Sequence, residues 1–285
     1  SAEDLTRKHS SIWGIVLRSR MVLTGEILSA LPQLKFIARS GSGLENIDMH
    51  AASQMNIAVF SSPEGNRDAV GEHVVGMLLT LLNRLHLAHQ EVKSGVWDRE
   101  SNRGYELKGK TIGIIGYGHM GSSLANKLSG FDMQILAYDK YKKLNESEPA
   151  AQVGEEEIFR EADIVSLHLP LSDETMGYAN DDFFGKFQKS IYFVNTARGK
   201  HVKTSALLNA LNSGKVRGAC LDVLEFESRT LEGISNDSDI LAMLKTDPRV
   251  LLTPHVAGWT YESYFKLSNV LADKILNTFD IINPS

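Results

Sequence analysis

Four polar residues that can act on a small organic acid each follow a short apolar run in the second half of the chain: Arg198, Glu225, Glu227 and His255. A guanidinium holds a carboxylate or a keto oxygen through two hydrogen bonds, which lysine cannot do. A histidine exchanges a proton near neutral pH, and an adjacent carboxylate fixes its tautomer. These residue types predict acid–base chemistry on a 2-hydroxy or 2-keto acid.

Each of these residues also has an ordinary structural explanation. Arg198 would suit a surface ion pair, His255 a buried hydrogen bond and Glu227 a solvated loop. The small neighbours Ala197 and Gly199 favour a group aimed into a cleft, because a surface ion pair would not need them. In an open parallel sheet, ligands bind at the carboxyl ends of the strands, so we expect the polar residues to share one edge.

A second candidate site is a glycine-rich loop formed by Gly116, Tyr117, Gly118, His119, Met120 and Gly121. Glycine-rich turns also show this pattern, but here it leaves a predicted strand (111–115) and enters a helical pattern. Gly116 then permits the tight turn, Gly118 lets a pyrophosphate approach the backbone, and Gly121 allows the helix to pack closely on the strand. The phosphates would lie at the helix N-terminus. The loop predicts dinucleotide binding.

Asp139 ends the next predicted strand, eighteen residues after Gly121. A carboxylate at this position accepts hydrogen bonds from the ribose hydroxyls of NAD and repels the 2′-phosphate of NADP. We therefore expect NAD, although Lys140, Lys142 and Lys143 follow closely and would suit a phosphate. With a nicotinamide bound near Arg198, the predicted reaction is hydride transfer to or from the carbon that carries the substrate oxygen.

Short apolar runs alternate with helical patterns along the whole chain, which predicts an α/β protein with parallel sheets. The predicted strands are 12–17, 35–39, 57–60, 111–115, 133–138, 163–167, 191–194, 218–221 and 250–253. One long helix is expected over 69–94 and another over 260–279. We expect a domain of residues 98–259 inserted into one made of residues 1–97 and 260–285, with an interdomain cleft that holds the ligand.

The composition agrees with a globular enzyme of 285 residues, with 42% apolar residues and a net charge of −5. Lys and Arg are scattered, so a nucleic-acid surface is not expected, and no run is apolar and long enough to span a membrane. Cys220 is the single cysteine, which favours a reducing, cytoplasmic setting. His86 and His89 have the spacing of a metal pair, but no other ligands cluster near them and we expect no metal.

The motifs GIIGYGHMG, FVNTARGK, GACLDVLEFE and LLTPHVAGWT together resemble the D-isomer-specific 2-hydroxyacid dehydrogenase family. The resemblance implies a Rossmann NAD-binding domain inserted into a flavodoxin-like substrate domain. It also implies that Arg198 binds the substrate, that His255 is the acid–base, and that Glu227 supports it, with Glu225 as the alternative. The cofactor contacts that it implies beyond the loop are those of Thr196, Ala197, Asp222 and Gly258, and the substrate carboxylate would meet backbone N–H groups of Ser42 and Gly43.

Within the family, the chain is most similar to a short form of phosphoglycerate dehydrogenase that lacks the regulatory domain, with a role in serine biosynthesis. Arg18 in LRSR matches an arginine that helps to hold the substrate phosphate. The alternatives are a glyoxylate or hydroxypyruvate reductase and an NAD-sensing, corepressor-like protein. The resemblance also implies a homodimer, and a natural chain that is longer at its N-terminus by one strand and helix, roughly thirty residues. A polar insertion before Asp247 departs from the family pattern.

Overall fold

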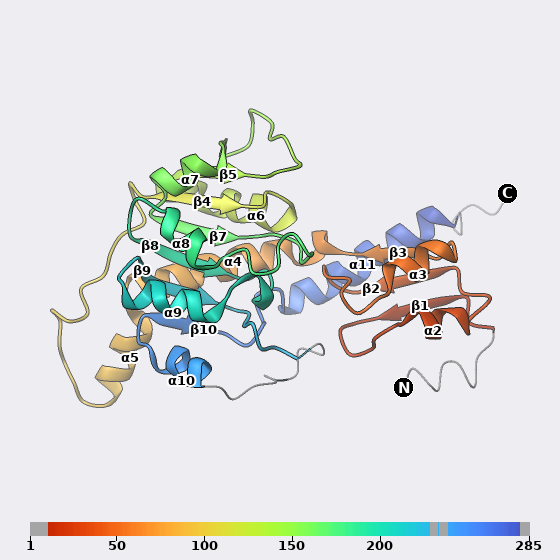
Figure 1. Cartoon of the computed structure of the whole chain (residues 1–285), viewed down its shortest axis with the longest axis horizontal. Helices are drawn as coiled ribbons and strands as arrows, with labels where there is room; N and C mark the ends of the chain where they lie inside the picture. The colour runs from red at the N-terminus through yellow and green to blue at the C-terminus, as the bar shows by residue number, and fades with distance from the viewer. Residues whose placement is uncertain (1–10, 229–232, 234–238, 280–285) are drawn as a thin grey trace. The chain divides into compact units, whose positions relative to one another are not determined.

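The structure of the chain is a computed structural model that describes residues 11–228, 233 and 239–279 (Figure 1). Residues 229–232 and 234–238, which belong to the polar insertion before Asp247, lie outside the described residues. The contacts divide the chain into two compact units, each of which is described by itself. The smaller unit takes Ser1–Arg67, Ser228–Ile234 and Trp259–Ser285, and the larger unit takes Asp68–Glu227 and Ser235–Gly258.

The smaller unit contains a parallel sheet of three strands in the order β1 (Gly14–Leu17), β2 (Phe36–Arg39) and β3 (Ala58–Ser61). Successive side chains of β2 enter different apolar clusters. Ile37 packs with residues of α2 (Gly25–Ser29) and α3 (Met49–Gln54), whereas Phe36 and Ala38 pack against Leu271 of α11 (Tyr261–Thr278). Because side chains alternate along a strand, both faces of this sheet are covered.

The larger unit contains a parallel sheet of seven strands in the order β10-β9-β8-β7-β4-β5-β6. The strands are β4 (Thr111–Ile115), β5 (Gln134–Tyr138), β6 (Ala151–Gln152), β7 (Ile164–Leu167), β8 (Ile191–Asn195), β9 (Val216–Leu221) and β10 (Val250–Leu252). Read from β6 to β9, this is the 3-2-1-4-5-6 order of the dinucleotide-binding fold, with β10 added at one edge. The order reverses between β4 and β7, which is where such sheets bind their ligands.

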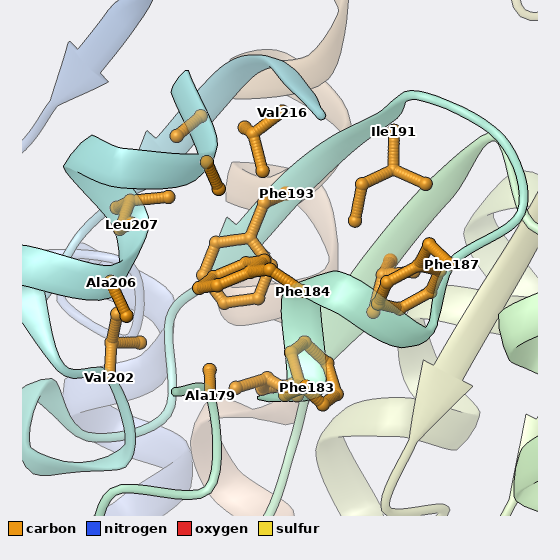
Figure 2. Close-up of a cluster of buried hydrophobic side chains, with 14 of the residues drawn as sticks. Ala179, Phe183, Phe184, Phe187, Ile191, Phe193, Val202, Ala206, Leu207 and Val216 are labelled. Atoms are coloured by element: carbon orange, nitrogen blue, oxygen red, sulfur yellow. The ribbon is translucent and has the colours of Figure 1, made fainter. Parts of the chain in front are cut away.

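Helices cover both faces of this sheet (Figure 1). On one face lie α4 (Pro63–Leu82) and α6 (His119–Leu128), the latter followed by a short 3-10 helix, η1 (Ser129–Phe131). On the other face lie α7 (Glu155–Glu161), α8 (Asp181–Lys186), α9 (Thr204–Asn212) and α10 (Asp239–Thr246). Figure 2 shows part of the apolar cluster on this second face. The rings of Phe184 and Phe193 lie edge to face there, with their centroids 5.2 Å apart. This packing fixes β8, the strand that leads to Arg198.

The nine predicted strands are all present, and the prediction of parallel sheets is confirmed. The short strand β6 was not predicted, because a two-residue edge strand leaves no periodic pattern. The single helix predicted over 69–94 is wrong. It is two helices, α4 and α5 (Leu85–Lys93), separated by Arg84 in the left-handed conformation at φ 54°.

The break between α4 and α5 is explained by contacts with a later segment of the chain, residues 104–105. The carbonyl of Leu82 accepts a hydrogen bond from the N–H of Tyr105, and Gly104 lies so close to Asn83 that an added Cβ would come within 2.7 Å of its backbone. The returning segment therefore takes the place of a further helical turn. Sequence periodicity cannot show a contact between residues that are more than twenty positions apart.

The compact units differ from the predicted domains in the stretch 68–97, which belongs with the larger unit. The reason is that Val74, Leu78 and Leu82 of α4 are buried against Ile112, Ile114 and other residues of the larger sheet. Among the described residues, no helix is both long and apolar enough to cross a bilayer.

Candidate active site

Arg198 leaves the sheet through a turn that the buried side chain of Asn195 holds. The side-chain amide of Asn195 donates to the carbonyl of Arg198 at 2.9 Å, and its oxygen accepts from the N–H of Ala197 at 3.1 Å. Gly199 follows, and a Cβ there would come within 1.8 Å of the carbonyl oxygen of Leu224. Only glycine lets the turn after β8 approach the turn after β9 so closely, which accounts for the small residues around the arginine.

Glu227 and His255 are brought together, as predicted. Oε2 of Glu227 lies 2.8 Å from Nδ1 of His255, and Oε1 accepts from the N–H of Leu224 at 2.5 Å. A carboxylate only accepts, so Nδ1 carries the proton and Nε2 is the ring nitrogen left for a substrate. Both side chains are about one-fifth exposed.

Glu225, the alternative partner, is used elsewhere. Its Oε2 accepts from the N–H of Thr204 at 2.8 Å, and its Oε1 lies 3.6 Å from Nζ of Lys203. The carboxylate therefore stabilises the start of α9. Of the two glutamates, Glu227 is the one in contact with His255.

Asp222 is buried, with 1% of its surface exposed, and its carboxylate is already used within the protein. It accepts from the hydroxyl of Thr253 at 2.5 Å and from the N–H groups of Val256 and Ala257 at 2.9 and 2.8 Å. A carboxylate has about four lone pairs, so one remains. The predicted contact of Asp222 with the nicotinamide amide stays a prediction, and its visible role is to organise the turn that contains His255.

The glycine loop has the geometry that a pyrophosphate needs. Gly116 has a φ of 90°, and a Cβ there would lie 2.6 Å from the carbonyl oxygen of His168. A Cβ on Gly121 would lie 2.2 Å from the carbonyl oxygen of Gly116, whereas one on Gly118 would meet no atom within 4 Å. Gly116 and Gly121 therefore serve the packing, and Gly118 borders open space. No side chain caps the N-terminus of α6, so its N–H groups are left for an anion.

The other loop residues contribute mainly backbone. The ring of Tyr117 is buried, and its hydroxyl donates to Glu148 at 3.2 Å, so it faces the protein. Burial, together with Glu148, raises the pKa of Tyr117 above its ordinary value. His119 is exposed and Met120 is half-buried. A dinucleotide at this loop would thus meet main-chain groups, as the motif implies.

Asp139 lies at the end of β5, as predicted, and is tied to the glycine loop. Its carboxylate accepts from the N–H groups of Tyr117, Tyr141 and Lys142 at 2.7, 3.0 and 2.9 Å. Burial raises the pKa of Asp139, but these three donors together with the Lys142 ammonium outweigh it and hold the pKa below its ordinary value. The group is therefore ionised at neutral pH, with room for about one further donor such as a ribose hydroxyl.

The predicted nicotinamide contacts lie around the same strand ends. Thr196 follows β8, and its buried hydroxyl has no hydrogen-bond partner among the described residues. Buried hydroxyls are seldom left unpaired, so this one suits a ligand amide. Ala197 is also buried, and Gly258 follows the turn that contains His255. The residues present thus fit NAD along the edge from β4 to β10.

The three predicted substrate contacts lie on the smaller unit, at the carboxyl edge of its sheet. Arg18 follows β1, and its guanidinium lies 4.1 Å from the ring centre of Trp259 and 5.3 Å from that of Tyr264. Ser42 and Gly43 follow the neighbouring strand β2, and their N–H groups donate to no other described residue. The hydroxyl of Ser42 donates to Asn66 at 2.9 Å. The aromatic neighbours of Arg18 were not predicted, because residues 18 and 259 are far apart in sequence.

Two further polar residues at the site were missed. Asn195 directly follows the predicted strand 191–194 and was not predicted to hold the turn, although the pattern N-T-A-R-G is a usable signal for a turn residue. His73 was not predicted at the site either, and its Nε2 lies 3.1 Å from the hydroxyl oxygen of Thr253. No cluster of three or more metal-ligating side chains occurs in the part of the chain that the structure describes.

Comparisons with known proteins agree with this geometry. The model of the "D-isomer specific 2-hydroxyacid dehydrogenase, NAD binding domain" matches residues 75–257. A D-3-phosphoglycerate dehydrogenase of Archaeoglobus fulgidus is 34% identical over 97% of this chain and 51% of its own length. A hydroxypyruvate reductase of Thermotoga maritima is 34% identical over 94% of this chain and 85% of its own length.

Among solved structures, a D-lactate dehydrogenase of Aquifex aeolicus in complex with NAD and lactic acid superposes with a TM-score of 0.85. It is 30% identical and is covered to 90%, over the whole of this chain. The chain spans about half the length of the D-3-phosphoglycerate dehydrogenases of Archaeoglobus fulgidus and Bacillus subtilis. The family model covers more than half of the chain, and its domain contains the glycine loop, Arg198, Glu227 and His255. The chain therefore belongs to the D-isomer-specific 2-hydroxyacid dehydrogenase family and carries its NAD-binding domain.

Proposed function

We propose that the protein is an NAD-dependent dehydrogenase that interconverts a D-2-hydroxy acid and the corresponding 2-keto acid. The observation that carries the proposal is the contact of 2.8 Å between Glu227 and His255, on the same sheet edge as the open glycine loop. A structural histidine would not need a dedicated carboxylate and a free Nε2. A simple NAD-binding protein would not need either residue.

In the direction of reduction, His255 donates the proton from Nε2 to the keto oxygen of the substrate. Glu227 holds the Nδ1–H and stabilises the imidazolium that forms when the reaction runs in reverse. Arg198 orients the substrate through two hydrogen bonds to its carboxylate and keto oxygen. NADH, when bound, supplies the hydride.

The test is the consumption of NADH with four keto acids: phosphohydroxypyruvate, hydroxypyruvate, glyoxylate and pyruvate. We expect at least one to be reduced, and the variant His255→Gln to lose this activity while it still binds NADH. Full activity of His255→Gln would refute the proposed acid–base. Binding of NADH without turnover of any of these acids would favour the NAD-sensing alternative.

We further propose 3-phosphoglycerate and phosphohydroxypyruvate as the substrate pair. Arg18 supports this, because its guanidinium packs on Trp259 and Tyr264 and makes no hydrogen bond or ion pair among the described residues. Such an arginine has its N–H groups left for an anion such as a phosphate. A hydroxypyruvate reductase is the second candidate, since the relative with that name matches over more of its own length. The ratio of kcat/KM for phosphohydroxypyruvate and hydroxypyruvate separates the two.

We also propose that the protein is a homodimer through α5 and the segment after it. Four large apolar side chains are exposed there: Leu85, Val92, Val96 and Trp97. Three of them, together with Ala88, line an apolar hollow of about 170 Å³. Exposed apolar surface of this kind is typical of a subunit contact. Light scattering after size-exclusion chromatography should give twice the chain mass, and Trp97→Lys should shift it toward a monomer.

A further inference from the structure

His73 lies on α4 and is joined to the turn that contains His255, although the proposed mechanism makes no use of it. Its Nε2 lies 3.1 Å from the hydroxyl oxygen of Thr253 and 3.7 Å from Oδ1 of Asp222. These three residues come from α4, the end of β9 and the segment after β10. Asp222 is buried and His73 is about one-quarter exposed, so the contacts are largely shielded from water.

The chemistry of the three groups fixes the direction of the hydrogen bonds. The hydroxyl of Thr253 has a single hydrogen, and Oδ1 of Asp222 lies 2.5 Å away as its acceptor. As a carboxylate, Asp222 has no hydrogen to donate in return. The oxygen of Thr253 can therefore only accept from the ring of His73. It follows that Nε2 of His73 carries a hydrogen, in the neutral tautomer as well as in the imidazolium.

The same carboxylate holds the backbone around His255. Asp222 accepts from the N–H groups of Val256 and Ala257 at 2.9 and 2.8 Å, and its carbonyl accepts from the N–H of His255 at 2.7 Å. His255 itself has a φ of 55°, in the left-handed region that residues other than glycine rarely adopt. Such a conformation persists only where its surroundings hold it in place. Asp222 and its partners supply that constraint.

We propose that His73 is a positioning residue for the reaction. By donating Nε2–H to Thr253, it orients the hydroxyl that holds Asp222, and Asp222 holds the left-handed turn from which the ring of His255 reaches Glu227. This inference rests on the proposed function, because it requires His255 to be the acid–base. It assigns to His73 an effect on the rate of turnover rather than on the binding of NADH.

Two substitutions at position 73 separate the donor from the rest of the side chain. Gln places an N–H at nearly the same reach as Nε2, so His73→Gln should keep kcat within about twofold of the wild type. Leu has a similar volume and no donor, so His73→Leu should lower kcat roughly tenfold, the loss expected for one buried hydrogen bond. The KM for NADH should be unchanged in both variants.

A second pair of substitutions tests the shared path. Thr253→Ser keeps the hydroxyl and should retain kcat, whereas Thr253→Val keeps the shape, lacks the hydroxyl and should lose at least as much as His73→Leu. The double variant His73→Leu/Thr253→Val should be no worse than Thr253→Val, because both changes break one network. Thermal unfolding and NADH binding are measured on every variant. A merely structural role for His73 would lower stability without the rescue of kcat by Gln.

The tautomer gives a test that needs no variant. In a long-range ¹H–¹⁵N spectrum of the wild-type protein, Nε2 of His73 should show the chemical shift of a protonated ring nitrogen. A neutral ring with its proton on Nδ1 would overturn the proposal.

Three results with the variants would also overturn the proposal: full kcat in His73→Leu, an equal loss in His73→Gln, or additive losses in the double variant. If His255→Gln is inactive while His73→Leu is fully active, positioning fails and the proposed function stands. If His255→Gln is active, the proposed function fails.

Discussion

The glycine loop and the proposed acid–base pair, Glu227 and His255, lie on one edge of the same sheet, but they are built in different ways. At the loop, the essential features are missing side chains: Gly116 and Gly121 fit against backbone, and Gly118 borders open space. Around His255 the features are side chains that reach it from another strand end: Glu227 and Asp222 both follow β9, and they hold the ring of His255 and the backbone after it. The loop is therefore defined by consecutive residues, and the acid–base pair by residues that only the fold brings together.

This difference predicts how each region responds to substitution. A substitution in the glycine loop acts by steric exclusion, because an added methyl group occupies the volume of a phosphate or of a neighbouring carbonyl. A change near His255 acts through hydrogen bonds, so a variant that keeps the donor or acceptor should be tolerated. The two regions should also separate kinetically, with binding of NADH dependent on the first and turnover on the second.

The largest effect is expected at Arg198. Arg198→Lys keeps the charge but loses the two-pronged geometry, so kcat/KM for the keto acid should fall roughly a hundredfold to a thousandfold. The affinity for NADH, measured by fluorescence titration, should stay within about twofold. Arg217→Lys is the control, because Arg217 lies on β9 and packs over Tyr105 and Tyr192, which belong to neither region. Unchanged turnover in Arg198→Lys would show that Arg198 does not orient the substrate.

The next effect distinguishes the two glutamates. Glu227→Gln keeps an acceptor for Nδ1–H but removes the charge that stabilises the imidazolium, so kcat should fall about tenfold to a hundredfold, part of the usual contribution of acid–base catalysis. Glu225→Gln affects the start of α9 and should leave kcat within about twofold. Steady-state rates over a range of pH compare the two variants. Equal losses would mean that the contact with His255 does not support catalysis.

The sequence predicts the features that consecutive residues define, and it does not predict the contacts between residues that lie far apart in the chain. Contiguous motifs predicted the glycine loop, Asp139, the strands and their parallel pairing. The partnership of Glu227 with His255 came from a family resemblance, since spacing alone left Glu225 open. The break at Arg84 and the contact of His73 with Thr253 depend on residues that the fold brings together from distant positions. No local pattern records such contacts.

A smaller effect is expected at the glycine loop. Gly118→Ala adds a methyl group where no protein atom lies within 4 Å, so thermal stability should be unchanged. The affinity for NADH should fall about tenfold, the equivalent of roughly 1.4 kcal/mol, because the methyl group occupies the space of the pyrophosphate. Gly185→Ala on α8 also meets no neighbour and should leave the affinity for NADH unchanged. Unaltered NADH binding by Gly118→Ala would place the phosphates elsewhere.

The last comparison is between two histidines, one in each region. Both residues are partly exposed, but their partners differ. His255 is paired with Glu227, whereas His168 follows β7, its carbonyl oxygen packs against Gly116, and its Nε2 is 2.9 Å from the hydroxyl of Ser166. Burial lowers the pKa of His168 from 6.5 to about 4. The imidazole of His168, beside the glycine loop, is therefore neutral in the folded protein above this pKa.

This difference makes stability depend on pH in a definite direction. Between pH 6.5 and 4 the unfolded chain binds a proton at His168 and the folded protein does not, so the free energy of unfolding falls as the pH is lowered, by up to about 1.4 kcal/mol per pH unit and about 3 kcal/mol in all. His168→Gln should flatten this slope. Urea unfolding from pH 6.5 to 5 measures it above the range in which most carboxylates titrate. An equal slope in the variant and the wild type would show that the imidazole is charged in the folded protein.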